Sequence, residues 1–351
     1  MRHSEMNPEV RRLIAEGIVI PAHPLALNAD RTLDVAHQRA LTRYYIDAGA
    51  GGLAVGVHTT QFAIRGVGLY KPVLELAAET AASWTKRPLA MVAGLVGSTR
   101  QAVAEAKIAR GIGYHAGLLS LAALKSASEQ EIVAHCEAVA REIPLVGFYL
   151  QPAVGGVILS ADFWRRFAAI DNVIAIKIAP FNRYRTLDVL RGVATANALD
   201  RITLYTGNDD HILLDLMLPF DLRDQGVTTR AHIKGGLLGH WSVWTASALK
   251  QFEMCRAARG KTSLPADLLA LDARVTDCNS ALFDVANNFH GCIAGCHEIL
   301  RRQGLMQGIW CLDPAEGLSP GQMAEIDRVC REHADLADDA FVAANLQKWL
   351  A

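Results

Sequence analysis

The chain has 351 residues, of which 51% are hydrophobic and 20% charged, and its 35 Lys and Arg nearly balance 36 Asp and Glu. This apolar content excludes a disordered chain, and the net charge of −1 argues against a nucleic-acid binder, whose surface would be basic. Apolar runs stay shorter than the roughly 18 residues of a membrane span, and the first ten residues lack the apolar core of a signal peptide. Seven cysteines without regular spacing fit a reducing compartment. We therefore expect a globular, cytoplasmic protein with no membrane or nucleic-acid partner.

Short apolar runs alternate with amphipathic stretches along most of the chain. Nearly continuous apolar runs of this kind are typical of parallel strands that are covered on both faces. The helical patterns between them include residues 36–49, 99–113 and 128–143. Eight such strands favour a closed (β/α)8 TIM barrel, of the α/β class, over an open doubly wound sheet. The predicted strands are residues 17–22, 52–57, 89–94, 114–121, 145–150, 173–179, 202–207 and 239–245.

The pattern divides the chain into three parts. Residues 1–16 form an amino-terminal extension, residues 17–246 the barrel, and residues 247–351 a carboxy-terminal region of helices. Residues 220–236 are longer than a usual connection, and we expect an extra loop there, before the last strand.

Three polar residues follow the predicted strand 52–57. His58 shares the parity of the small residues of that strand, so its imidazole would point into the barrel mouth and exchange protons there. The hydroxyls of Thr59 and Thr60 would hold a carboxylate, although a β-branched strand end that caps the next helix is an equal alternative.

A lysine and a tyrosine lie on neighbouring predicted strands. In 173–179 alternation places Lys177 inward near the carboxyl end, where burial lowers the pKa of an amine and favours attack on a carbonyl. In 145–150 the same argument points Tyr149 inward, at the level of Lys177. Taken singly, a lysine reaching solvent and a tyrosine packed in the core are the more common arrangements.

The order of these motifs resembles the dihydrodipicolinate synthase / N-acetylneuraminate lyase family, which comprises pyruvate-handling class I aldolases on (β/α)8 barrels. The matching segments are 53-LAVGVHTTQ-61, 148-FYLQP-152, 174-IAIK-177, 206-TGNDD-210 and 235-GGLLGHWSVWT-245. The resemblance implies that Lys177 forms the Schiff base, Tyr149 relays protons, and Thr59 or Thr60 binds the pyruvyl carboxylate. It also implies that Gly207, in the fourth segment, borders the substrate.

The sequence departs from the family pattern at several places. The position of the family's carboxylate-binding arginine is Val154, and residues 119–125 lack the tyrosines expected there. We therefore do not expect a true dihydrodipicolinate synthase. His58 replaces a relay threonine and would carry protons instead. Arg185 would receive a distal carboxylate of the substrate, with a surface ion pair as the alternative.

Together these observations predict a lyase or synthase, of aldolase or dehydratase type, that acts on pyruvate or a related 2-oxo acid through Lys177. No cofactor or metal is expected, because the lysine supplies the electron sink. The resemblance also implies a homo-oligomer, either a dimer or a tetramer. One alternative is an aldolase for an aromatic or otherwise apolar aldehyde, and another is an inactive barrel that binds a small molecule or regulates another protein. We interpret Asp209 and Asp210 as caps of the helix that follows.

Overall fold

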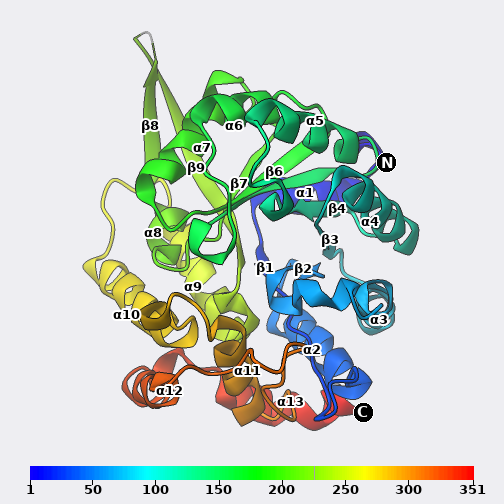
Figure 1. Cartoon of the computed structure of the whole chain (residues 1–351). Helices are drawn as coiled ribbons and strands as arrows, with labels where there is room; N and C mark the ends of the chain where they lie inside the picture. Colours follow the sequence, from blue (N-terminus) through cyan, green and yellow to red (C-terminus); the bar gives the residue numbers. More distant parts are fainter. Residues whose placement is uncertain (225) are drawn as a thin grey trace.

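Eight parallel strands form a barrel in the computed structural model, which describes residues 1–224 and 226–351 (Figure 1). They follow one another in the order β1-β9-β7-β6-β5-β4-β3-β2, and a parallel bridge between Ala22 and Ala54 links the two end strands. The predicted (β/α)8 barrel is therefore confirmed. Its strands are β1 (Val19–Pro21), β2 (Gly52–Val55), β3 (Ala90–Leu95), β4 (Ala116–Leu119), β5 (Leu145–Leu150), β6 (Val173–Ala179), β7 (Thr203–Thr206) and β9 (Val227–Leu238).

Helices cover the outside of the barrel. Asp34, Ser98, Ser128 and Ser160 begin four of them by accepting a hydrogen bond from a backbone N–H of the first turn. These caps explain why the amphipathic stretches of the sequence start where they do. The helices are α2 (Val35–Ala48), α3 (Tyr70–Trp84), α4 (Thr99–Ile112), α5 (Glu129–Ala140), α6 (Ala161–Ala168), α7 (Arg183–Thr195), α8 (Ile212–Met217) and α9 (Thr245–Ala258).

The core has two layers, one between the strands and the helices and one inside the barrel. The amino-terminal helix α1 (Pro8–Glu16) belongs to the inner layer, because its Val10 and Ile14 pack with the inward-facing side chains of the strands. The Tyr205 hydroxyl of β7 donates a hydrogen bond to the Ile14 carbonyl at 2.9 Å. With α1 against the amino ends of the strands, the carboxyl ends remain for a functional site.

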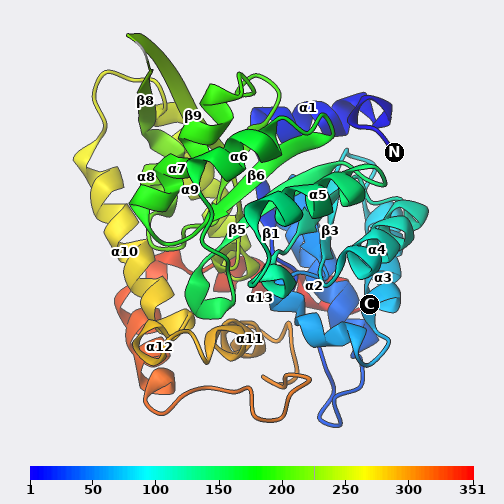
Figure 2. The same ribbon diagram turned by 45° about the horizontal axis from the view of Figure 1, so that its top comes forward.

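The carboxy-terminal helices gather on the side of the barrel that carries α2, α8 and α9 (Figures 1 and 2). The Tyr44 hydroxyl of α2 joins them to the barrel by donating a hydrogen bond to Asp338 at 2.7 Å. Within the described residues we find no helix with the length and apolar character that a membrane crossing requires. The four helices are α10 (Ala266–Leu282), α11 (Cys292–Arg302), α12 (Gln322–Glu332) and α13 (Asp339–Leu350).

The last barrel strand lies earlier in the chain than predicted. Residues 239–245 form a 3-10 turn, η6 (His240–Ser242), and the start of α9, while the end of β9 pairs with β1 and β7. The loop expected at 220–236 is an antiparallel hairpin of β8 (Pro219–Asp224) and β9, which projects from the barrel (Figure 1). The glycines of β9 made this strand hard to recognise from the sequence. They are required by the packing, because a Cβ on Gly236 would lie 2.5 Å from the Trp241 ring.

Candidate active site

A cavity of about 70 Å³ lies at the carboxyl end of the barrel, and we call it the mouth cavity. Its walls come from the ends of β5, β6 and β7, from the 3-10 turn η2 (His58–Thr60), and from the region around α11. The polar side chains that line it are His58, Thr59, Gln151, Lys177 and Asp209. Four of the predicted site residues are thus brought together: His58, Thr59, Lys177 and Gly207.

Lys177 points into the mouth cavity from β6, and its role as the Schiff-base lysine stays a prediction. The side chain is 9% exposed, and its Nζ lies 4.5 Å from the centre of the Phe148 ring on β5. Burial lowers the pKa of this amine below the usual 10.5, because a charged ammonium loses hydration in an apolar surrounding. Gly207 leaves the space that the lysine occupies, since a Cβ there would lie 2.6 Å from Lys177 Cε.

Asp209 is a site residue that the sequence interpretation missed. Its side chain lines the mouth cavity and is 8% exposed, instead of capping α8, which has no side-chain cap. Burial raises the pKa of this carboxyl, while the nearby Lys177 ammonium acts in the opposite direction. Its parity was a usable signal, because Asp209 stands two residues after Gly207, the cavity-lining glycine at the end of β7.

The turn after β2 carries the imidazole and the hydroxyl that line the mouth cavity. Burial and the nearby Lys177 lower the pKa of His58 to about 4, so the ring is neutral at pH 7. Thr59 is 6% exposed, and its hydroxyl has no hydrogen-bond partner among the described residues. A buried, unpaired hydroxyl is costly in a folded protein, which makes Thr59 a ready donor for an incoming oxygen.

Arg65 holds this turn against the neighbouring strand. Its guanidinium donates hydrogen bonds to the carbonyls of Gly56 and Gly94 and pairs with the buried carboxylate of Glu105 at 3.0 Å. One side chain thus ties the segments that follow β2 and β3, and thereby fixes the positions of His58 and Thr59.

Thr60 does not line the mouth cavity among the described residues, and its predicted substrate contact is wrong. Its hydroxyl accepts hydrogen bonds from the N–H groups of Gly56 and Val57, at 2.9 and 3.2 Å, and donates to the His23 carbonyl at 2.6 Å. These bonds exhaust what a hydroxyl can make. Thr60 therefore stabilises the turn and leaves only Thr59 to meet a ligand.

Tyr149 points away from the barrel interior, so its predicted position beside Lys177 is wrong. Its hydroxyl exchanges hydrogen bonds of 3.3 Å with the carbonyl and the N–H of Leu159, and its ring packs 5.2 Å from that of Trp164 on α6. The inward side chain of β5 is instead its neighbour, Phe148. Parity could not be assigned from the sequence, because β5 is apolar on both faces and its pairing with β6 shifts register after Leu145.

Arg185 also lies outside the mouth cavity as far as the described residues define it. It lies in the first turn of α7, where its guanidinium is 3.8 Å from the Asp188 carboxylate. This geometry is typical of a surface ion pair. The structure favours the alternative of a surface ion pair and gives no support to the predicted contact with a distal carboxylate.

Residues of the carboxy-terminal region cover the mouth cavity, and we call them its roof. The sequence did not predict this arrangement. Phe283 and Phe289 reach the mouth cavity from the segment between α10 and α11, and Cys292 and Ile293 reach it from the start of α11. The Phe289 ring packs edge-to-face on the ring of Phe181, which follows β6, with the two ring centres 5.7 Å apart. Apolar residues in a helical region gave no indication of which ones face the barrel.

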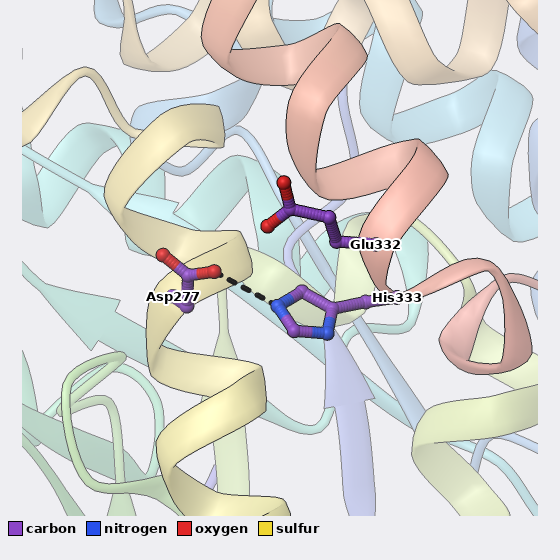
Figure 3. Close-up of side chains that lie close together, drawn as sticks. All are labelled: Asp277, Glu332 and His333. Carbon is purple, nitrogen blue, oxygen red and sulfur yellow. Dashed lines mark hydrogen bonds and ion pairs between the residues drawn. The ribbon is translucent and has the colours of Figure 1, made fainter.

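A second group of titratable side chains lies between α10 and α12 and carries different chemistry. Asp277, Glu332 and His333 come close enough to hold a metal ion (Figure 3). Arg328, however, donates hydrogen bonds to both carboxylates at 2.9 and 3.0 Å, and His333 bonds Asp277 at 2.8 Å. The guanidinium neutralises the charge that a cation would need, so this helix cluster is an ion-pair network that joins two helices.

Fold and mouth cavity together define a (β/α)8 barrel with an inward lysine at the carboxyl end of its sixth strand. The model of the dihydrodipicolinate synthetase family matches residues 16–234, and the chain belongs to that family, whose members are lyases and synthases of class I aldolase type. A sequence search of curated proteins finds no match.

Solved structures share the fold at low sequence identity. Dihydrodipicolinate synthase from Acinetobacter baumannii, complexed with pyruvate, is 20% identical, with a TM-score of 0.73 over 90% of this chain and 98% of that one. N-acetylneuraminate lyase from Fusobacterium nucleatum is 18% identical, with a TM-score of 0.71 over 91% and 99%. The synthase from Oceanobacillus iheyensis is 14% identical, with a TM-score of 0.74 over 93% and 99%.

Proposed function

We propose that the protein is a Schiff-base-forming lyase or synthase that acts on pyruvate or a related 2-oxo acid through Lys177. One observation carries the proposal: a buried amine with a lowered pKa lines the mouth cavity together with a buried carboxylate. Pyruvate as a ligand is supported by the A. baumannii relative, whose structure holds it. The reaction needs no cofactor, because the imine itself withdraws electrons.

The steps follow from the cavity lining. The neutral Lys177 amine attacks the keto carbon of the 2-oxo acid, and the resulting carbinolamine takes up a proton and loses water to give a protonated imine. The free hydroxyl of Thr59 donates to the substrate carboxylate. A proton then leaves the carbon next to the imine, which gives an enamine that can join an aldehyde; the reverse sequence breaks that bond.

Asp209 is the group best suited to move these protons, in the place that the sequence interpretation gave to Tyr149. The pKa of Asp209 is raised toward neutral pH, and near that pH a carboxyl can both accept and return a proton. His58, neutral and in the same cavity, is the second acceptor. The predicted homo-oligomer and cytoplasmic location stay predictions.

Borohydride trapping tests the proposal. The full-length protein is incubated with pyruvate and sodium borohydride, digested, and examined by mass spectrometry. We expect one reduced pyruvyl group on Lys177 and none on the Lys177→Met variant, since the thioether fills similar space without a nucleophile. The exposed Lys71 is the internal control, because ordinary ammonium groups stay unmodified. Absence of an adduct in the folded wild-type protein would contradict the proposal and favour a binding protein.

A further inference from the structure

Most of the side chains that line the mouth cavity are apolar, and we call the large ones its apolar wall. This wall consists of Phe148 and Leu150 of β5, Val154 of the following turn, Phe181 after β6, and Phe283 and Phe289 of the carboxy-terminal region. Among the described residues no arginine lines the cavity, so it offers no permanent cation. A second substrate bound here would meet aromatic and aliphatic groups.

Two aromatic residues of the rim are held in an unusual backbone conformation. Phe181 and Phe289 have φ values of +48° and +66°, a region that bulky side chains rarely adopt. Hydrogen bonds fix both: the Phe181 N–H donates to Asn208 Oδ1 at 3.1 Å, and the Phe289 N–H donates to the Asp284 carbonyl at 3.0 Å. A strained backbone conformation costs free energy that the rest of the fold must offset, and such conformations cluster at ligand-binding and active sites. Here both residues of one ring contact are strained.

We propose that the second substrate of the reaction is an aldehyde with an aromatic group, which packs against Phe148, Phe181 and Phe289. This inference rests on the proposed function. An anionic or polyhydroxylated aldehyde would lose hydration of its charge or hydroxyls without gaining partners on this wall, whereas an aryl ring gains contact area and edge-to-face geometry.

The proposed reaction balances in atoms and electrons. The enamine carbon of the pyruvyl group attacks the aldehyde carbon, one carbon–carbon bond forms, and the aldehyde oxygen takes up a proton. Water then hydrolyses the imine, which frees Lys177 and a 4-aryl-4-hydroxy-2-oxo acid. Loss of a further water gives the conjugated arylidene 2-oxo acid. No oxidant or reductant enters, and the reverse reaction returns pyruvate and the aryl aldehyde.

An aldehyde panel tests the inference on the full-length protein. Pyruvate is supplied with benzaldehyde, with succinic semialdehyde as an anionic probe, or with glyceraldehyde as a polyol probe, and product is quantified by mass spectrometry. We expect kcat/KM for benzaldehyde to exceed either other value by about 100-fold, the discrimination that an apolar pocket achieves against a substrate with added polar groups. Equal or better use of an anionic or polyol aldehyde would overturn the inference.

Variants assign the preference to the wall. Phe181→Ala and Phe289→Ala should each lower kcat/KM for benzaldehyde by about 10-fold, while borohydride trapping of pyruvate stays within about twofold. Tyr184→Ala, which truncates an aromatic residue that is 81% exposed on α7, is the matched control and should change neither. Absence of borohydride trapping in the wild-type protein would refute the proposed function, whereas trapping without a preference for benzaldehyde would refute only this inference. The two outcomes are therefore distinguishable.

Val154→Arg covers the case in which the phenylalanine variants do not fold. The new guanidinium at the rim should narrow the preference for benzaldehyde over succinic semialdehyde by about 10-fold or more. An unchanged preference in the folded variant would show that this wall does not select the aldehyde, and would overturn the inference.

Discussion

The molecule holds two clusters of titratable groups that differ in how well they are satisfied. In the mouth cavity Lys177, Asp209 and His58 are enclosed, and the Asp209 carboxylate accepts one long hydrogen bond, of 3.4 Å from the His240 N–H. In the helix cluster Asp277 is bonded by both Arg328 and His333 at 2.9 Å or less. The two clusters therefore place similar chemical groups in opposite situations.

The pKa directions express this difference. In the mouth cavity burial shifts the pKa of Lys177 down and that of Asp209 up, so each group is moved toward its neutral form. In the helix cluster hydrogen bonds from Arg328 and His333 lower the pKa of Asp277 to about 2, which fixes its charge. Satisfied groups stabilise a fold, and under-satisfied groups retain reactivity, so substitutions in the two clusters should have opposite consequences.

Asp209→Asn should produce the largest effect on the reaction. We expect the turnover of pyruvate with an aldehyde to fall by about 100-fold to 1,000-fold, because the amide cannot transfer protons. Borohydride trapping should persist, and its pH midpoint should shift down, since the carboxylate that favours the Lys177 ammonium is gone. The measurements are steady-state kinetics and the pH dependence of the trapping rate.

A purely structural role for Asp209 would give a different result. In that case the variant would lose thermal stability, and trapping and turnover would decline together with no shift of the pH midpoint. Asp210→Asn is the neighbouring control, because Asp210 is absent from the lining of the mouth cavity as described.

The adjacent threonines give a matched pair of Thr→Val substitutions. Thr59→Val removes an unpaired hydroxyl, so we expect unchanged stability but about a 10-fold higher pyruvate concentration for half-maximal trapping, the cost of one bond to a charged group. Thr60→Val leaves two N–H groups and a carbonyl unpaired and should lower the free energy of unfolding by about 2–3 kcal/mol. Urea unfolding and trapping titrations measure both; the reverse assignment would contradict the structure.

The sequence allowed the barrel and part of the mouth cavity to be predicted. Lys177 was identifiable because it is a single charge in an apolar strand, and that contrast fixes which way the side chain faces. His58 followed from the small residues before it, which mark the inner face of β2. In both cases polarity changes along the strand, so the alternation carries information.

Other features left no such contrast. The residues of β5 are apolar on both faces, so alternation could not separate Phe148 from Tyr149, and the register shift lies in the pairing rather than in the sequence. Asp209 was assigned to a helix cap because acidic residues before a helix usually serve as one. The roof residue Phe289 lies about 110 residues beyond β6 in a helical region, and its meeting with Phe181 depends on tertiary packing.

Asp277→Asn should affect stability without affecting the reaction. We expect a loss of about 1 kcal/mol in the free energy of unfolding at pH 7, discounted because the group is part-exposed. The pKa of Asp277 is about 2 in the folded protein and 3.8 in the reference state, so this contribution is present above pH 3.8 and lost as the pH falls through about 2. The wild-type and variant stabilities should therefore converge in acid.

Asp171→Asn is the control for the helix cluster, since Asp171 forms an exposed pair with Arg2 at 3.5 Å and should contribute almost nothing. Turnover of both variants should equal that of the wild-type protein. A variant of Asp277 that lost activity at full stability would show that the two clusters are coupled.

Tyr149→Phe should have the smallest effect, and it tests the orientation of β5 directly. The hydroxyl makes only 3.3 Å bonds to Leu159, so its removal should cost about 1 kcal/mol of unfolding free energy and leave turnover and trapping within about twofold. A phenol that relayed protons beside Lys177 would instead slow turnover by about 100-fold or more. That result at unchanged stability would place the Tyr149 hydroxyl inside the mouth cavity and remove the need for Asp209 as the proton carrier. A small effect instead leaves proton transfer to Asp209 and His58, the titratable groups that line the cavity with Lys177.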